Sequence, residues 1–366
     1  MQYPTQLKAL ASFPITEEVV NLKPIGNGHI NDTFGVVVKT PQGAQLKYVL
    51  QRVNDSIFQD VDTLQSNLFA VTDHIRHKLE QKGVSDINRH ALTFFKTKEG
   101  QTYTRQDGAV WRLSLFIEGS KSYDAVTPKL AYEAGKAFGD FHTMLSDIPE
   151  GKLGETIPNF HNMTFRLQQL RDAVATDKAG RLSEVRELVD QLLQRAEKMT
   201  IQDRLYADGK LIKRTNHCDT KVNNILFDEK TDEVLCVIDL DTVMPGFVLS
   251  DIGDFIRTAV NTGEEDDENL DHIQVDMEIF KAYTRGYMEE AQKFLTPLEI
   301  SLLPYGGRLL TYMQTVRFLS DYLNGDTYYK THKPKHNLIR SIAQFEFLRR
   351  LEDKQEEMDA FMQQWL

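Results

Sequence analysis

Hydrophobic and polar residues alternate in short stretches along the first third of the chain. Residues 19–40 contain two stretches rich in β-branched residues on either side of a Gly/Asn turn, and residues 44–54 follow a Pro-Gln-Gly turn. Residues 60–82 have the pattern of a helix. Three further stretches resemble strands: residues 91–97, 102–106 and 109–119. We therefore predict an antiparallel sheet with one helix before Gly119.

From Thr127 onward, apolar residues recur at helical spacing. Thr127 is a suitable N-cap, and Pro128 fits the first position of a helix. The apolar residues that follow fall on one face, at i, i+4, i+7 and i+11: Ala134, Phe138, Phe141 and Leu145. More helices are predicted at 163–175, 181–199 and 275–294, and from the capping box Thr296–Glu299 to about Tyr322.

These patterns predict an α+β chain with two lobes, and its 366 residues suit two domains. We place a small β-rich N-lobe at 1–117 and a large, mainly helical C-lobe at 118–366, joined by a short connector near 116–120. The apolar run 234–244 ends in carboxylates and is predicted to be a buried hairpin strand. The acidic run 264–271 is predicted to be a solvated loop.

Charge and cysteine content narrow the class of protein. The net charge is −11, which opposes nucleic-acid binding because phosphate contacts need clustered Lys and Arg. A nucleotide is still compatible, since Mg²⁺, backbone N–H groups and a few local cations can hold it. The two cysteines, Cys218 and Cys236, offer no disulfide framework and are predicted to be small buried residues. Without a long apolar run or a secretory signal, we expect a cytoplasmic protein with no membrane partner, and a monomer.

The clearest chemical signal is a pair of neighbouring motifs. His217, Asp219 and Asn224 lie on one segment, and Asp239 and Asp241 follow some fifteen residues later. Phosphoryl transfer needs one carboxylate beside the attacking hydroxyl, and oxygen ligands for Mg²⁺ on the nucleotide phosphates. Asp219 fits the first role, and Asn224 and Asp239 fit the second. For Asp241, a ligand role and a structural role both stay open.

The spacing HxDxxxxN followed by IDxD resembles the aminoglycoside phosphotransferase and choline kinase group, relatives of the protein kinases. Asp251-Ile-Gly-Asp254 and the helix end Gly135 to His142 match two further elements of that family. The resemblance implies a bilobal protein-kinase-like fold, with ATP and Mg²⁺ as cofactors and Asp219 as the catalytic residue. His217 is expected to orient the loop, and Asp251 to accept hydrogen bonds from the loop's backbone N–H groups.

The resemblance also implies a nucleotide site in the N-lobe. The turn after residue 25 would cover the nucleotide, and the backbone of the segment 116–119 would bind the adenine edge. The family carries a phosphate-binding Lys or Arg on the strand 48–53, where this chain offers Gln51 and Arg52. The nucleotide-binding residues expected on this basis are Gly26, Asn27, Gly28, Arg52, Phe116, Ile117 and Glu118.

A closer resemblance concerns the acceptor. Segments such as GNGHINDTF, HCDTKVNNILFD and RFLSDYLNGDTYY are similar to bacterial kinases that phosphorylate the anomeric hydroxyl of N-acetylglucosamine and N-acetylgalactosamine. This resemblance implies direct in-line transfer to a sugar that contacts Asp219, Arg317 and Tyr328, with His29 and Asn31 lining the same side. Without it, the simplest interpretation of Arg317 is an i,i+4 ion pair with Asp321.

Two alternatives differ in chemistry. A kinase of the same fold could act on another small hydroxyl acceptor, such as homoserine, a choline-like amine or another sugar. A non-catalytic nucleotide-binding pseudokinase is favoured only by the absence of a clear lysine on the strand 48–53. The presence of Asp219, Asn224 and Asp239 argues against it.

Overall fold

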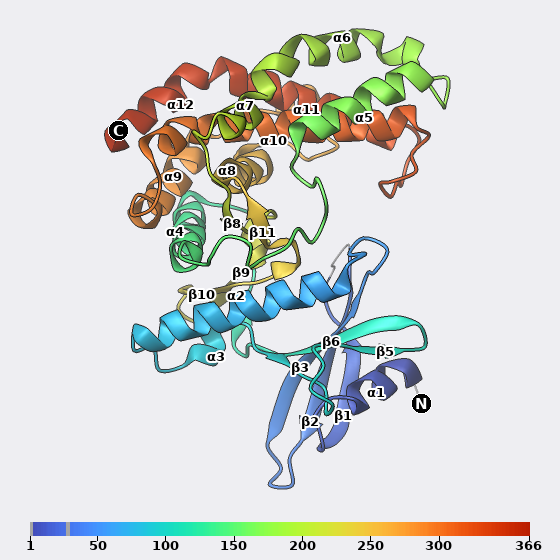
Figure 1. The fold of residues 1–366 in the computed structure, drawn as a ribbon, viewed down its shortest axis with the longest axis vertical. Helices are drawn as coiled ribbons and strands as arrows, with labels where there is room; N and C mark the ends of the chain where they lie inside the picture. The colour runs from blue at the N-terminus through green and yellow to red at the C-terminus, as the bar shows by residue number, and fades with distance from the viewer. Residues whose placement is uncertain (1–2, 27–29) are drawn as a thin grey trace. The chain divides into compact units, whose positions relative to one another are not determined.

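A computed structural model describes residues 3–26 and 30–366 of the chain. The chain forms two compact units, each described by itself below. The first comprises residues 1–122, 147–158 and 225–244, and the second comprises residues 123–146, 159–224 and 245–366. The first unit is built on antiparallel sheets and the second is mainly helical (Figure 1), which confirms the predicted α+β, bilobal kinase-like class. The single lobe boundary after residue 117 stays a prediction.

The main sheet of the first unit is antiparallel throughout, in the order β1-β2-β3-β6-β4, with β5 paired to β6. Its strands are β1 (Glu18–Pro24), β2 (Asp32–Lys39), β3 (Gln45–Val53), β4 (Phe94–Phe95), β5 (Thr104–Gln106) and β6 (Ala109–Leu115). Every stretch predicted as a strand before Gly119 contains one of these strands, although β4 and β5 are shorter than predicted.

The two faces of this sheet differ in chemistry. Because side chains alternate along a strand, the register aligns Phe34, Leu50 and Leu113 on one face, where they are buried with α1 (Pro4–Ala11) in a hydrophobic core. The register aligns Gln51 with Thr33 on β2 and with Arg112 on β6, on the opposite face. The second face therefore carries a polar row across three strands.

Helix α2 (Val61–Gln81) holds two distant segments of the first unit in place. Asp60 caps its N-terminus by accepting a hydrogen bond from the Thr63 N–H, so the predicted helix at 60–82 is confirmed. The buried Asn67 side chain on α2 donates hydrogen bonds to the carbonyl oxygens of Gly154 (2.8 Å) and Val243 (2.9 Å). These bonds explain why residues far along the chain pack with the N-terminal sheet.

A second, three-stranded sheet in the same unit has the order β10-β9-β7. Its strands are β7 (Ser120–Lys121), β9 (Ile225–Asp228) and β10 (Val234–Val237). Besides α1 and α2, this unit contains α3 (Ile87–His90) and the 3₁₀ turn η2 (Leu240–Thr242). The antiparallel pair β9-β10 confirms the strand predicted at the start of the apolar run 234–244.

The second unit is built around long helices (Figure 1). They are α4 (Pro128–Leu145), α5 (Met163–Thr176), α6 (Leu182–Met199), α7 (Ile201–Ala207), α8 (Val248–Phe255), α9 (Met277–Ala291), α10 (Pro297–Leu323), α11 (His336–Asp353) and α12 (Gln355–Met362). Shorter elements are β8 (Arg214–Asn216), η1 (Val222–Asn224), β11 (Met244–Gly246), the π-helix η3 (Ile256–Val260), η4 (Leu270–His272) and η5 (Gln363–Trp365). The capping box predicted at Thr296 is present and begins α10.

Glycines let the helices of this unit touch backbone to backbone. A Cβ atom at Gly253 on α8 would lie 2.3 Å from the carbonyl oxygen of Gly306 on α10. A Cβ atom at Gly135 on α4 would lie 2.1 Å from the carbonyl oxygen of Tyr283 on α9. No larger residue fits at either position without moving a helix, because packed interiors leave no spare volume. These contacts fix α4 and α8, which hold the loop described below.

The acidic run 264–271 is a loop with no buried residue, as predicted, and some of its side chains also bind neighbouring helices. Glu265 accepts a hydrogen bond from Arg257 at 3.0 Å, and Asp266 contacts the buried His336 at 2.8 Å. Arg257 lies on η3 and His336 begins α11. Among the described residues, no helix has the length and hydropathy needed to cross a membrane.

Candidate active site

Asp219 lies on the loop between β8 and η1 of the second unit. Its Oδ1 atom forms an ion pair with Lys221 at 3.0 Å, and its Oδ2 atom accepts a hydrogen bond from Asn224 Nδ2 at 3.0 Å. Burial would raise the pKa of Asp219, but the charges of Lys221 and His217 outweigh burial and lower it. The carboxylate is therefore ionised at neutral pH, and its side chain keeps 28% of its surface exposed, so a hydroxyl can reach it.

Asn224 is oriented by the same loop. Its amide nitrogen donates to both the backbone oxygen of Asp219 (2.8 Å) and the Asp219 carboxylate. The amide oxygen is therefore left as the accepting end of the side chain. An oxygen donor next to a carboxylate has the ligand chemistry that Mg²⁺ prefers.

Asp251 on α8 binds the backbone of the loop that carries Asp219. Its fully buried carboxylate accepts hydrogen bonds from the backbone N–H groups of His217 and Cys218, each at 2.7 Å, and contacts His142 Nε2 at 2.7 Å. Burial would raise the pKa of Asp251, but the hydrogen bond and charge of His142 lower it. These are the backbone contacts that the sequence led us to expect. They hold Cys218 at a φ of 64°, a conformation that costs energy for a residue with a side chain.

The helix end that the sequence singled out takes part in the same network. His142 Nδ1 contacts the hydroxyl of Tyr287 on α9 at 2.8 Å, and the rings of Phe138 and Phe141 pack edge-on against the His217 ring. His217 is fully buried between them. The elements that carried the family resemblance thus meet in one network of contacts within the second unit.

Asp254 was expected as part of the motif 251–254 but without a role of its own, and Arg257 was not expected from the sequence. Asp254 Oδ1 accepts hydrogen bonds from Arg257 Nη2 (2.9 Å) and Nε (3.2 Å), whereas its buried Oδ2 has no hydrogen-bond partner among the described residues. Burial raises the pKa of Asp254 despite Arg257, and the negative charge of Asp219 adds to this shift. The i,i+3 spacing from Asp251 could have suggested that Asp254 faces the same site.

Asp239 and Asp241 lie in the first unit and differ sharply. Asp239 lies two residues after the end of β10, is exposed and has a left-handed backbone (φ 59°). Asp241 is buried and accepts hydrogen bonds from Arg112 Nη1 (2.5 Å), Arg112 Nη2 (3.0 Å) and Asn31 Nδ2 (2.6 Å). Asp241 was left open as a metal ligand or a structural residue, and its hydrogen bonds to Arg112 and Asn31 favour the structural role.

Gln51 and Arg52 lie on opposite faces of β3, so at most one of them can face a nucleotide bound to the sheet. Arg52 is exposed and pairs with Asp32 at 3.1 Å. Gln51 Oε1 accepts hydrogen bonds from Arg112 Nη2 (2.9 Å) and Nε (3.0 Å). The buried cation on the polar face of the sheet is Arg112, which the sequence analysis missed although an arginine inside an apolar strand was visible.

The structure describes some, but not all, of the other residues that we expected to bind the nucleotide. Gly26 has a φ of 72° that favours glycine, and Asn27, Gly28 and His29 lie outside the described residues. Near the connector, the Phe116 N–H donates to the Lys47 carbonyl (3.1 Å), and the Ile117 carbonyl accepts from Ser120 (2.6 Å). Glu118 pairs with Lys47 at 2.9 Å.

Asn31, which was expected on the acceptor side, accepts a hydrogen bond from the Asn54 N–H at 2.9 Å in addition to its bond to Asp241.

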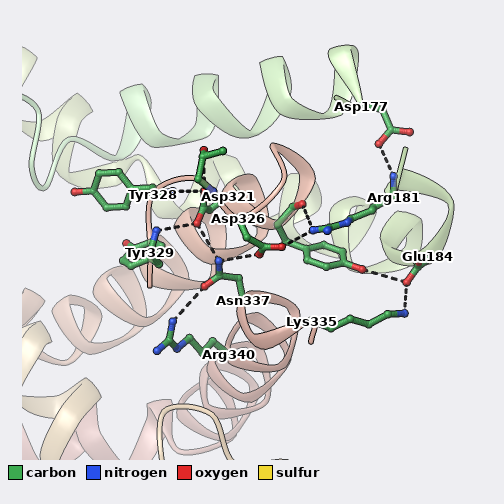
Figure 2. Close-up of polar contacts among 12 residues, drawn as sticks. Asp177, Arg181, Glu184, Asp321, Asp326, Tyr328, Tyr329, Lys335, Asn337 and Arg340 are labelled. Carbon is green, nitrogen blue, oxygen red and sulfur yellow. Dashed lines mark hydrogen bonds and ion pairs between the residues drawn. The ribbon is translucent and has the colours of Figure 1, made fainter. Parts of the chain in front are cut away.

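Arg317 on α10 does not form the i,i+4 ion pair with Asp321, so that interpretation is wrong. Figure 2 shows the reason: one Asp321 oxygen accepts hydrogen bonds from the backbone N–H groups of Thr327 and Tyr328, and the other from that of Tyr329, each at 2.9 Å. The side-chain amide of Asn337 donates to Asp321 as well, at 2.9 Å. The carboxylate is thus saturated by the loop after α10.

The guanidinium of Arg317 lies among aromatic rings instead. Its central carbon is 5.4 Å from the Phe160 ring centre, 5.5 Å from that of Tyr329 and 6.0 Å from that of Tyr328. Arg317 Nη1 donates a hydrogen bond to Gln314 at 3.2 Å, and Tyr328 is 63% exposed. Phe160 and Tyr329 were not predicted from the sequence, because their proximity depends on the packing of α5 and α10.

Comparison with known proteins gives a family and several structural relatives. The sequence model of the phosphotransferase enzyme family matches residues 21–289. An aminoglycoside phosphotransferase from Alicyclobacillus acidocaldarius is 13% identical, with 98% of this chain and 96% of that chain covered, at a TM-score of 0.61. A choline/ethanolamine kinase family protein from Mesorhizobium loti is 14% identical, with 98% of both chains covered, at a TM-score of 0.57.

An amicoumacin kinase is also similar in structure, at 13% identity and a TM-score of 0.56, with 97% of this chain and 94% of that chain covered. Its structure is a complex with AMP-PNP, Ca²⁺ and a compound abbreviated Ami. At these identities the likeness concerns the fold.

Proposed function

Because the chain belongs to the phosphotransferase enzyme family, we propose that it is a kinase that uses ATP and Mg²⁺ to phosphorylate the anomeric hydroxyl of N-acetylhexosamines. The observation that carries this proposal is the Asp219 carboxylate, which is ionised, partly exposed and fixed by Lys221 and Asn224. The choice of acceptor rests on the end-to-end resemblance of the sequence to N-acetylhexosamine 1-kinases and on the surroundings of Arg317.

The proposed step is a direct transfer. The anomeric oxygen forms a bond to the γ-phosphorus of ATP, the bond from that phosphorus to the β-phosphate oxygen breaks, and ADP leaves. Asp219 accepts the hydroxyl proton as the new bond forms. Because an anomeric hydroxyl is more acidic than an ordinary alcohol, a carboxylate with a lowered pKa suffices as the acceptor. Lys221 brings a cation next to the transferred group.

Asn224 and Asp239 are the proposed ligands of Mg²⁺. Their donors are oxygen atoms, and the described residues contain no group of three or more His, Cys, Asp or Glu side chains that could hold a metal alone. Such a sparse set fits a cation that the nucleotide phosphates help to bind. When bound, Mg²⁺ neutralises negative charge on the phosphates.

The proposed nucleotide site uses the polar face of the main sheet and the connector. Gly26 at the turn and the backbone of 116–118 are retained as nucleotide contacts, with Gln51 or Arg52 as the strand residue. Arg112 is proposed to act through Asp241 rather than on the phosphates, because its guanidinium already donates to Asp241 and Gln51.

The surroundings of Arg317 favour a neutral acceptor. Choline is a cation, and a cationic acceptor is usually bound by carboxylates or an aromatic cage. Here the aromatic rings surround a guanidinium that forms no ion pair with a carboxylate of the described residues. A hydroxyl-rich sugar can accept hydrogen bonds from Arg317 and stack on Tyr328.

Replacing Asp219 tests the proposal. We expect Asp219→Asn to reduce kcat with ATP and N-acetylglucosamine roughly 10²- to 10⁴-fold, because the amide accepts no proton. Steady-state kinetics measures the loss of kcat, and calorimetry measures ATP binding, which should persist. The matched control is Asp208→Asn, an exposed carboxylate of the same unit, which should keep normal kcat. Near-normal turnover in Asp219→Asn would contradict the assignment.

The alternative acceptors are separated by the same assay. Turnover with homoserine or choline in place of N-acetylhexosamines would favour another kinase of this fold. Nucleotide binding without turnover of any acceptor would favour a pseudokinase.

A further inference from the structure

Two arginines of the second unit, Arg166 and Arg317, are joined through one aromatic residue, Phe160. Arg166 on α5 donates hydrogen bonds to Gln169 (2.9 Å) and to the carbonyl oxygen of Phe160 (3.1 and 3.4 Å). Arg317 on α10 donates to Gln314. Neither guanidinium forms an ion pair with a carboxylate in the part of the chain that the structure describes. Burial, and then the positive charge of Arg317, lower the pKa of Arg166 to about 10.

Aromatic side chains surround this pair. The Phe160 ring lies beside Arg317, and the Phe160 carbonyl accepts the hydrogen bonds from Arg166, so one residue bridges both. The rings of Tyr328 and Tyr329 cover Arg317 from the loop after α10. Arg317 is therefore flanked by aromatic rings, and both guanidiniums donate hydrogen bonds to neutral groups.

His161 adds a neutral group to the same cluster. Its ring stacks on that of Phe160 at 4.4 Å, and its Nδ1 atom is shielded from solvent with no hydrogen-bond partner among the described residues. The loss of water around the ring, and then the charge of Arg317, lower the pKa of His161 to about 3. The imidazole therefore adds no charge near neutral pH, and Nδ1 can bind an uncharged donor or acceptor.

The loop that carries the two tyrosines is rigidly held. Besides Asp321, Figure 2 shows Asp326, which pairs with Arg181 at 2.6 Å and accepts a hydrogen bond from Asn337 at 2.9 Å. Asp321 near the end of α10 is bound by the loop backbone and by Asn337 on α11, and Asp326 in the loop is bound by Asn337 and by Arg181, the residue before α6. Neither carboxylate pairs with Arg317.

The cluster is electrostatically linked to the Asp219 loop. The charge of Arg257 acts on His161 and also on Lys221, which pairs with Asp219. Under the proposed function the acceptor contacts Asp219, Arg317 and Tyr328, and Arg166 is joined to Arg317 through Phe160.

We propose that Arg166 and Arg317 act together as a charge filter in the acceptor site, admitting a neutral oxygen-bearing substituent and excluding an ammonium group. The inference rests on the proposed function, since it assumes that the acceptor binds beside Asp219. An ammonium group next to Arg166 and Arg317 would be a third positive charge beside two guanidiniums that form no ion pair with a described carboxylate, whereas an acetamido carbonyl or a hydroxyl accepts hydrogen bonds from guanidinium.

Three sugars that differ at one position test the filter: N-acetylglucosamine, glucose and glucosamine. Glucose lacks the acetamido group but is neutral. The comparison of N-acetylglucosamine with glucose therefore measures the loss of that group, and the comparison of glucose with glucosamine measures the gain of charge. We expect kcat/KM to fall from N-acetylglucosamine to glucose, and roughly a further 10- to 100-fold from glucose to glucosamine at neutral pH.

Variants of Arg166 then test whether the two arginines cause the discrimination between glucose and glucosamine. Arg166→Gln should bring glucosamine within about threefold of glucose, whereas Arg166→Lys, which keeps the charge, should retain the discrimination. The matched control is Arg171→Gln, an exposed arginine on the same helix, which should leave the ratio unchanged. A purely structural role of Arg166 would lower the rates of all three sugars together and would not change the glucose to glucosamine ratio.

Three outcomes would overturn the filter. They are equal use of glucose and glucosamine by the wild-type protein, an unchanged ratio in Arg166→Gln, and wild-type phosphorylation of choline or another ammonium-bearing alcohol. If the wild-type protein phosphorylates no N-acetylhexosamine, the proposed function fails instead, and this result is distinct from an altered ratio.

Discussion

The buried pair of Arg112 and Asp241 joins residues 129 positions apart in the sequence. Both side chains are only 4% exposed, and Gln51 and Asn31 satisfy further hydrogen bonds of the pair. Asp241 lies two residues after Asp239, so the pair holds the segment that carries the proposed metal ligand. Removing one member would leave the other charged and buried, which is more costly than losing an exposed pair.

We expect Arg112→Met to lower the free energy of unfolding by about 3 to 5 kcal/mol, because Asp241 loses its counter-charge. Arg52→Met removes an exposed pair on the adjacent strand and should cost less than about 1 kcal/mol. Urea denaturation of both variants measures the two costs. Equal costs would contradict the structural role of Arg112, and a recovery of stability in Arg112→Met/Asp241→Leu would support it.

At the scale of elements, the sequence predicts features that depend on neighbouring residues, and it does not predict features that depend on contacts between distant segments. The starts of α4 and α10 follow from capping residues next to them, Thr127 and Thr296, so they were predictable. The contacts of Asp251 with the loop were also expected, because the spacing of the motifs resembles a known family. The π-helix 256–260 and the anchoring of 264–271 depend on packing between helices, which no short pattern encodes.

Helix α8 stabilises the Asp219 loop through Asp251, and this contribution should depend on pH. The pKa of Asp251 in the folded protein lies below its ordinary value of 3.8. A carboxyl whose pKa is lowered by folding stabilises the protein fully above its unfolded pKa, and this stability is lost as the pH falls through the folded pKa. We therefore expect Asp251→Asn to cost about 3 kcal/mol or more at neutral pH, where two backbone N–H groups lose a charged acceptor.

Chemical denaturation of the wild-type protein and Asp251→Asn at several pH values checks this expectation. The difference in unfolding free energy should be constant from neutral pH to about pH 5 and should shrink below pH 3.8. Asp208→Asn should show almost no difference at any pH, because that carboxylate is exposed. A difference that grows toward acid would contradict the ionised, hydrogen-bonded state of Asp251.

At the scale of the whole molecule, the sequence predicted the class of fold and the motif that carries Asp219, Asn224 and Asp239. It did not predict the surroundings of the proposed acceptor site. Phe160, Arg166 and Arg317 come from different segments, and their meeting depends on how α5 packs against α10. The expected Arg317–Asp321 pair failed for the same kind of reason, since a loop after the helix competes for the carboxylate.

The position of the phosphate on the product tests the central claim most directly. Wild-type protein would be incubated with ATP, Mg²⁺ and N-acetylglucosamine, and the product analysed by ³¹P NMR and by its reducing end. We predict a sugar 1-phosphate that has lost its reducing end and is labile to acid, and no such product with Asp219→Asn. A phosphate on another hydroxyl with the reducing end intact, or ATP consumption without a sugar phosphate, would contradict the account.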